Sequence, residues 1–344
     1  MSSKYLLDIT LTTEKIGLLT AFASNLLLLY LLITKATSSY GSYKFLMIYF
    51  TIIEMTYSIL NVSSSMVAHS SNTSYVVFRP YNKQIGRKIC PALLVDFCGI
   101  YFALLILLAI HFVYRYIVVC KSQYTYLFER WKLVIWMALP LVIGTFQATL
   151  KYFAFAETPY LTELLREEFK TTYNITMESI CYNGPNYYIC DKNGECDFNL
   201  TAWFAMAFIG NSMTMALCLM AFCGVSICIQ LSRNKSDASD RTIRLQKQLM
   251  NALIIQSVIP ICLMYIPIAL LFLSPMVGIG IGPYGNIVMA TIAIYPPIDQ
   301  FAIILVIQDF RQAVKNIFCG EKYLIKSVRL SFGRLQSKVS TISS

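Results

Sequence analysis

Seven long apolar segments constrain the fold of this chain more than any other feature of its sequence. A membrane-spanning helix needs about 20 mostly apolar residues, and in lipid only a helix or a closed barrel satisfies its own backbone hydrogen bonds. The segments are too long and too uniformly apolar for barrel strands, so we expect helices. They span about residues 16–33, 45–67, 92–119, 133–155, 203–231, 249–273 and 286–307. The predicted fold class is an all-α integral membrane protein with a bundle of seven transmembrane helices.

The low content of charged residues indicates the same class. Only 13% of the 344 residues are charged, against about 25% in soluble domains. The mean hydropathy of +0.59 is high. This composition argues against a water-soluble enzyme of two domains. It also excludes a disordered chain, because disorder requires low hydrophobicity.

The distribution of charge predicts how the chain is oriented in the membrane. Seven spans place the two termini on opposite sides. With the amino terminus outside, the inner segments hold 18 basic and five acidic residues, and the outer segments hold ten of each. Cytoplasmic loops are enriched in Lys and Arg, so the amino terminus is predicted to lie outside. The net charge of +10 is divided among short loops, and we therefore expect no nucleic-acid partner.

This topology divides the chain into four parts. Residues 1–15 form an extracellular amino terminus, and residues 16–308 form the seven-helix domain. Residues 309–320 are predicted to form a short amphipathic helix on the inner leaflet, since apolar residues recur there at helical spacing. Residues 321–344 are predicted to be a disordered cytoplasmic tail.

Cysteines and glycosylation sequons fall on the outer side of this topology. The outer cysteines are Cys90, Cys181, Cys190 and Cys196. An even number in an oxidising space is compatible with two disulfides, for which three pairings exist, and we favour Cys90 bonding to the second outer loop. The predicted glycosylation sites are Asn72, Asn174 and Asn199.

Several short motifs carry a more specific signal. In chain order they are Asn25, Tyr43-Lys44-Phe45-Leu46-Met47-Ile48, Glu54, His111-Phe112-Val113-Tyr114-Arg115-Tyr116, Ser239-Asp240-Arg241-Thr242, Leu245-Gln246-Lys247-Gln248-Leu249, Gln256, Pro260, Tyr295-Pro296, Asp299 and Asp309-Phe310-Arg311. This set resembles the nematode serpentine chemoreceptors of the Str type, a family of G-protein-coupled receptors that includes the diacetyl odorant receptor. The resemblance covers nearly the whole chain. It departs from the family at Gln300, where proline usually follows the aspartate.

The resemblance implies an olfactory receptor without catalytic activity or cofactor. Such a receptor would lie in the plasma membrane of the sensory cilium of chemosensory neurons and serve chemotaxis. It would bind a small, volatile odorant and activate a heterotrimeric G protein through its Gα subunit. The alternative is a transporter or a ligand-gated channel, although no inverted repeat is visible. An intramembrane enzyme is a third class, but no span carries a metal cluster or a Ser/His pair.

Three polar residues are predicted to lie at similar depth in the membrane, namely Asn25, Glu54 and Asp299. Ionisable groups inside a membrane are costly and are functional candidates by default. They could form a network that holds water or a cation and rearranges on activation. A static hydrogen-bonded contact between helices is the alternative, and the sequence leaves both open.

Four polar residues in the outer halves of the spans could share one ligand cavity. They are Asp96, Tyr101, Asn211 and Tyr265. So few charges favour a small neutral ligand, although Asp96 could bind an amine. Prolines at 260, 267, 296 and 297 interrupt the sixth and seventh spans and would let these helices tilt.

Basic residues at the inner ends of the spans are the candidates for G-protein coupling. Arg115, with Tyr116 beside it, stands where rhodopsin-like receptors carry a functional arginine, although an interfacial arginine could also simply reach toward the lipid headgroups. Arg241, Arg244 and Lys247 would form a basic extension of the sixth span that could receive a helix of Gα. Cys319 is a candidate for palmitoylation, and phosphorylation of the tail could recruit a desensitising partner.

Overall fold

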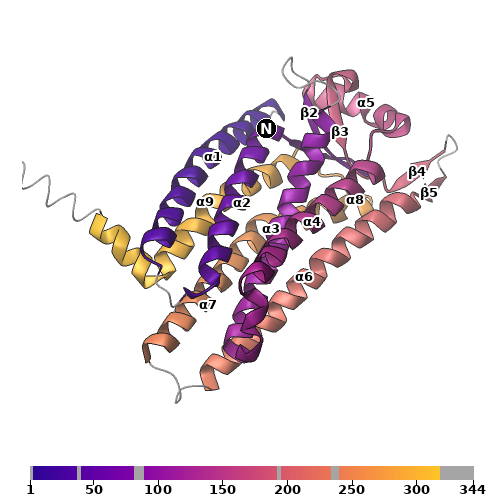
Figure 1. Ribbon diagram of the computed structural model, residues 1–344. Coiled ribbons are helices and arrows are strands. Elements are labelled where there is room, and N and C mark those ends of the chain that lie inside the picture. The colour runs from indigo at the N-terminus through magenta and orange to yellow at the C-terminus, as the bar shows by residue number, and fades with distance from the viewer. Residues whose placement is uncertain (1–2, 37–39, 81–88, 192–194, 234–239, 318–344) are drawn as a thin grey trace, which may run out of the picture.

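The computed structural model describes all residues except 1–2, 37–39, 81–88, 192–194, 234–239 and 318–344. Within this part of the chain, seven helices or continuous helix runs are long and apolar enough to cross a membrane, and they pack into one bundle (Figure 1). They are α1 (Ser3–Thr34), α2 (Tyr43–Ser64), α3 (Cys90–Cys120), α4 (Trp131–Ala154), α6 (Leu200–Arg233), the run of α7 (Asp240–Pro260), η4 (Ile261–Tyr265) and α8 (Ile266–Met276), and α9 (Gly285–Val306). The multi-pass fold class predicted from the sequence is confirmed.

Several helix boundaries differ from the predicted ones, and those of α1 and α2 show why. Helix α1 begins at Ser3 instead of residue 16, because its polar residues Thr10 and Glu14 are buried inside the protein, each only 2% exposed. Helix α2 ends at Ser64 instead of residue 67. Ser65 has a left-handed backbone with φ of 42°, and strand β1 (Val67–Ser70) follows. Burial of polar side chains extends the start of α1 beyond the apolar segment. A left-handed residue and the following strand end α2 before its apolar segment is complete.

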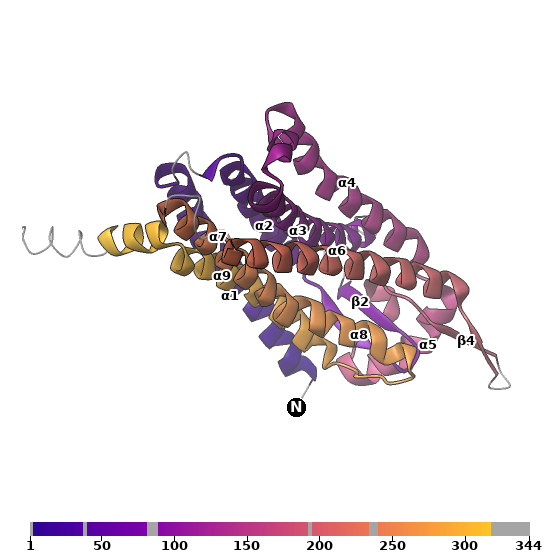
Figure 2. The same ribbon diagram turned by 90° about the horizontal axis from the view of Figure 1, so that it is seen from below.

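Helix α3 lies in the centre of the bundle and packs against α2, α4 and α6 (Figure 2). Its contact with α4 is a close backbone approach at Gly99 and Gly144. A Cβ atom placed at Gly99 would lie 2.9 Å from the carbonyl oxygen of Gly144. Small residues let transmembrane helices approach closely, since dispersion contacts replace the hydrophobic effect as the driving force in lipid.

The outer end of the bundle carries a three-stranded antiparallel sheet that the sequence analysis did not predict. It orders β1, β2 (Tyr75–Pro80) and β3 (Ile180–Asn183), with Phe78 opposite Tyr182. A disulfide joins Cys181 in β3 to Cys90 at the start of α3. The loop between α2 and α3 and the second outer loop are thereby built into one cover over the bundle.

The second outer loop also contains an amphipathic helix and a hairpin. Helix α5 (Pro159–Tyr173) begins after Thr158, whose hydroxyl accepts a hydrogen bond from the Leu161 amide, and its apolar face packs on the sheet. His69 in β1 lies 2.9 Å from a carboxylate oxygen of Glu168 in α5, and this contact lowers the pKa of Glu168. The hairpin of β4 (Tyr188–Cys190) and β5 (Cys196–Phe198) is closed by a second disulfide, Cys190–Cys196.

The last two spans are irregular, as their prolines predict. Helix α7 ends at Pro260, and the π-helical turn η4 separates it from α8. Pro296 and Pro297 lie inside α9. After a break at Ile307, residues 308–317 form the helix expected beyond the seventh span, with Phe310 fully buried.

The close approach of α3 and α4 predicts that a methyl group added at Gly144 destabilises the protein. In Gly144→Ala, the new Cβ would meet the carbonyl oxygen of Gly99 and lie 3.1 Å from the Cβ of Ala103. Overpacking of this kind costs about 1–3 kcal/mol. We expect a lower melting temperature for the detergent-purified protein. The control is Gly210→Ala in α6, where an added Cβ has open space around it. Equal melting temperatures for the two variants would contradict this packing.

Candidate functional site

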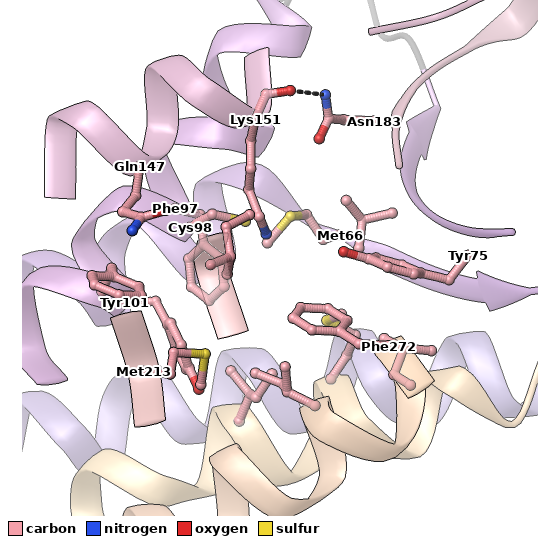
Figure 3. A pocket seen from close by; sticks show the side chains of 17 residues that line it. Met66, Tyr75, Phe97, Cys98, Tyr101, Gln147, Lys151, Asn183, Met213 and Phe272 are labelled. Atoms are coloured by element: carbon pink, nitrogen blue, oxygen red, sulfur yellow. Dashed lines mark hydrogen bonds between the residues drawn. The ribbon is translucent and has the colours of Figure 1, made fainter. Parts of the chain in front are cut away.

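A cavity that is partly open to the outside lies beneath the outer sheet (Figure 3). We call it the outer cavity. Its walls come from the sheet and from α3, α4, α6, α8 and α9, represented by Tyr75, Tyr101, Lys151, Met213, Phe272 and Met289. Most of the lining is apolar or aromatic. A largely apolar cavity with a few polar groups is the usual form of a small-molecule site.

The structure brings two of the four predicted ligand residues together here. Tyr101 lines the outer cavity, and the ring of Tyr265 packs edge-on against it with centroids 5.6 Å apart. Asp96 instead lies in a separate groove between α3 and α4 and is exposed. Asn211 is also exposed, on the surface of α6. The prediction of one shared cavity is wrong for these two residues, because the rotation of α3 and α6 turns them away from it.

The charged residue of the outer cavity is one that sequence analysis missed. Lys151 stands near the outer end of α4, and the described lining residues include no other Lys or Arg and no His, Asp or Glu. Its ammonium lies over the ring of Phe272, 5.4 Å from the centroid. The signal available in the sequence was a lysine within a span, at the position where α4 meets the outer loop.

Inside the bundle, Glu54 and Asp299 belong to one polar cluster. The side-chain amide of Gln300 donates a hydrogen bond to the Glu54 carboxylate, and Gln256 lies against Asp299. Glu54, Asp299 and Gln300 are each 0% exposed. Asn25 hydrogen-bonds within its own helix, to the carbonyl of Ala21 at 2.8 Å. Gln300, which departs from the family pattern, is therefore a central member of the cluster.

At the cytoplasmic end, Arg115 is turned into the bundle and is only 2% exposed. Its guanidinium donates a hydrogen bond of 3.1 Å to the backbone carbonyl of Gln246 in α7 and lies 5.3 Å from the ring centroid of Tyr43 in α2. We call these two contacts the Arg115 clamp. An arginine that simply reached for the lipid headgroups would not have this buried position.

The other coupling candidates surround this clamp. Tyr116 packs on Phe222 of α6, and Lys247 is exposed on α7 together with Arg244. Arg241 lies in the first turn of α7, and its side chain is outside the described residues. A hydrogen bond that the sequence did not suggest joins α7 to the helix of residues 308–317. In it, the side-chain amide of Gln248 donates to that of Gln308 at 3.1 Å.

The predicted modification sites differ in accessibility. Asn72 and Asn174 are exposed in turns of the outer cover. The amide of Asn199 is engaged, since it donates to the carbonyl of Asn186 at 2.9 Å at the start of α6. Cys319 and the tail beyond residue 320 lie outside the described residues.

A seven-helix bundle with a cavity beneath its outer sheet and a buried arginine at the inner end of its third span has the architecture of a G-protein-coupled receptor. Residues 10–315 match the family described as "Serpentine type 7TM GPCR chemoreceptor Str", and the chain belongs to this family. Its members are receptors, and their fold is that of a multi-pass membrane protein.

Named relatives agree with this assignment. The chain is 28% identical to Serpentine receptor class r-10 of Caenorhabditis elegans over 99% of this chain and 100% of that protein. It is 28% identical to G-protein coupled receptor str-33 of the same organism, over 91% and 92% of the two chains. Squid rhodopsin shares the fold with a TM-score of 0.60 at 12% identity, covering 92% of this chain and 86% of that one.

The hydrogen bond between Gln300 and Glu54 predicts that substitutions of these two residues are energetically coupled. Gln300→Met removes the donor to Glu54 and leaves a buried carboxyl without that partner, which costs about 1–3 kcal/mol of unfolding free energy. Adding Glu54→Leu removes both polar groups. We therefore expect the double variant to be less destabilised than the sum of the two single variants, measured by unfolding in mixed micelles. Additive losses would show that the two side chains do not interact.

Proposed function

We propose that this protein is a chemosensory receptor that binds a small ligand in the outer cavity and activates a heterotrimeric G protein at its cytoplasmic face. The observation that carries the proposal is that two spans connect the two sites. The third span contributes Tyr101 to the cavity and Arg115 to the clamp. The sixth span contributes Leu271 of α8 to the cavity and Gln246 of α7 to the clamp.

A change of tilt in the sixth span would link ligand binding to the inner face. The π-helical turn η4 lies between the cavity end and the clamp end of this span. Single π turns and prolines are places where helices bend, and π turns recur at functional sites. A ligand that binds more tightly to one tilt shifts the population toward it. If that tilt moves α7 away from α3, the bond from Arg115 to Gln246 breaks.

Opening of the clamp would expose the surface that receives Gα. Arg115 and Tyr116 would then face the inner side together with Arg241, Arg244 and Lys247. A helix laid into a groove is a common mode of recognition, and a basic groove suits an amphipathic helix that carries acidic groups. Family membership supports a volatile ligand, chemotaxis and a place in the sensory cilium as parts of the same proposal.

Nucleotide exchange on purified Gα tests the proposal directly. The receptor is reconstituted in nanodiscs and screened with small volatile compounds. Exchange that rises with one of them supports a receptor. A current evoked by the same compounds from the protein alone in a planar bilayer, with no exchange, would instead support the channel alternative.

The Arg115 clamp predicts two separate effects of Arg115→Met. A hydrogen bond to a charged group contributes about 1.5–3 kcal/mol, so its loss favours the open arrangement by about tenfold or more. We expect a longer distance between spin labels on the inner ends of α3 and α7 without ligand.

In the same variant, ligand-evoked exchange should be lost, because the arginine that would meet Gα is absent. Lys132→Met, at the inner start of α4, is the matched control for the loss of one inner cation. An unchanged distance together with normal exchange in Arg115→Met would refute the proposed coupling role.

A further inference from the structure

The chemistry of the outer cavity is set by one cation. Lys151 lies in the last turn of α4, three residues before the helix ends at Ala154, and its side chain extends into the cavity (Figure 3). The ring of Phe272 holds the ammonium from the side of α8, at 5.4 Å from the centroid. A cation over an aromatic face is a favourable contact, but it supplies no negative charge.

No carboxylate compensates the charge of Lys151 within the cavity. Among the described residues that line it there is neither Asp nor Glu. Asp96 faces the separate groove between α3 and α4, and Glu54 and Asp299 belong to the polar cluster. None of the ion pairs in the described part of the chain includes Lys151. The half-buried Lys151 therefore places a basic group without a carboxylate partner at the wall of the cavity.

Two further polar groups in the wall of the cavity lack hydrogen-bond partners in the described structure. They are the Oε1 atom of Gln147 and the hydroxyl of Tyr101, on side chains only 4% and 7% exposed. Gln147 lies one helical turn before Lys151, so both side chains point from the same face of α4. The Oε1 atom of Gln147 accepts a hydrogen bond, whereas the hydroxyl of Tyr101 can donate one. The hydroxyl of Tyr101 and the ammonium of Lys151 are therefore donors that these lining residues offer to an oxygen acceptor.

We infer that the ligand of the outer cavity is a small organic carboxylate with an apolar body, such as a short-chain fatty acid. Its carboxylate accepts hydrogen bonds from the ammonium of Lys151 and from the hydroxyl of Tyr101. Its alkyl chain lies against apolar lining residues that include Met213, Leu271 and Ile292. An amine is excluded because it would bring a second positive charge to Lys151.

This inference rests on the proposed function only in taking the outer cavity as the ligand site of the receptor. It replaces the expectation of a neutral ligand or an amine at Asp96, because the structure turns Asp96 out of the cavity and turns Lys151 into it. Hydrogen bonds between ions are stronger than those between neutral groups. The head group should therefore decide affinity among compounds with the same alkyl chain.

A panel of four compounds with one alkyl chain tests the inference on the full-length receptor in nanodiscs. Hexanoate, hexanamide, hexanol and hexylamine are each titrated at neutral pH while the melting temperature of the receptor is measured. We expect hexanoate to stabilise the receptor most and hexylamine least. In Lys151→Met, the affinity for hexanoate should fall about tenfold or more, while that for hexanol stays the same.

Charge reversal makes the test sharper. Lys151→Glu should lose the response to hexanoate and gain one to hexylamine, because the side chain at this position of the cavity wall is then acidic instead of basic. Lys170→Met removes an exposed lysine of α5 on the same outer side and should leave all four responses unchanged. The wild-type panel alone decides the head-group preference if a Lys151 variant does not fold.

Two results would overturn the inference. One is a wild-type receptor that responds to hexanamide or hexylamine as strongly as to hexanoate. The other is an unchanged affinity for hexanoate in a folded Lys151→Met variant. The proposed function is judged separately, by nucleotide exchange on Gα. Binding of hexanoate without exchange would refute G-protein activation and leave the ligand class standing.

Discussion

The backbone contact between Gly99 of α3 and Gly144 of α4 is the interaction on which the rest of the structure depends. It lets the backbones of the central helix and α4 approach closely at these two glycines, and the disulfide at Cys90 holds the outer end of the same helix to the sheet. Tyr101 and Arg115 both stand on α3, and Lys151 stands on α4. The positions of the cavity and the clamp thus both depend on how this pair of helices packs.

The sequence predicted those parts of the fold for which the bilayer imposes the pattern. Helix length and apolarity follow from membrane thickness, and the inner excess of Lys and Arg follows from how loops are retained in the cytoplasm. The outer sheet was not predicted, because its strands are short and β2 pairs with β3 across a long stretch of chain. The start of α1 was predicted too late for a similar reason. Thr10 and Glu14 are polar, and the residues that bury them lie elsewhere in the sequence.

Site residues were predictable when depth alone determined their role and unpredictable when rotation about the helix axis mattered. Their depth placed Glu54 and Asp299 in one cluster. Gln300, which stands where the family pattern has proline, belongs to the same cluster through its hydrogen bond to Glu54. Asp96 and Asn211 have suitable depths but face away from the cavity. In a helix that is apolar on all sides, the sequence carries little information about which side faces inward. Lys151 was overlooked for the same reason.

Arg115 at the inner end is buried and Lys151 at the outer end is half-buried, and these two basic side chains differ in their partners. Arg115 finds a backbone carbonyl and an aromatic ring within the protein, so its charge is partly compensated before any partner arrives. Lys151 has an aromatic ring but no acceptor among the described contacts, and the carboxylate ligand inferred above would supply one. An inner end that is closed by its own contacts and an outer end that is completed by a ligand are what a population shift requires. The free energy gained at the cavity can then offset the loss of one hydrogen bond to Gln246.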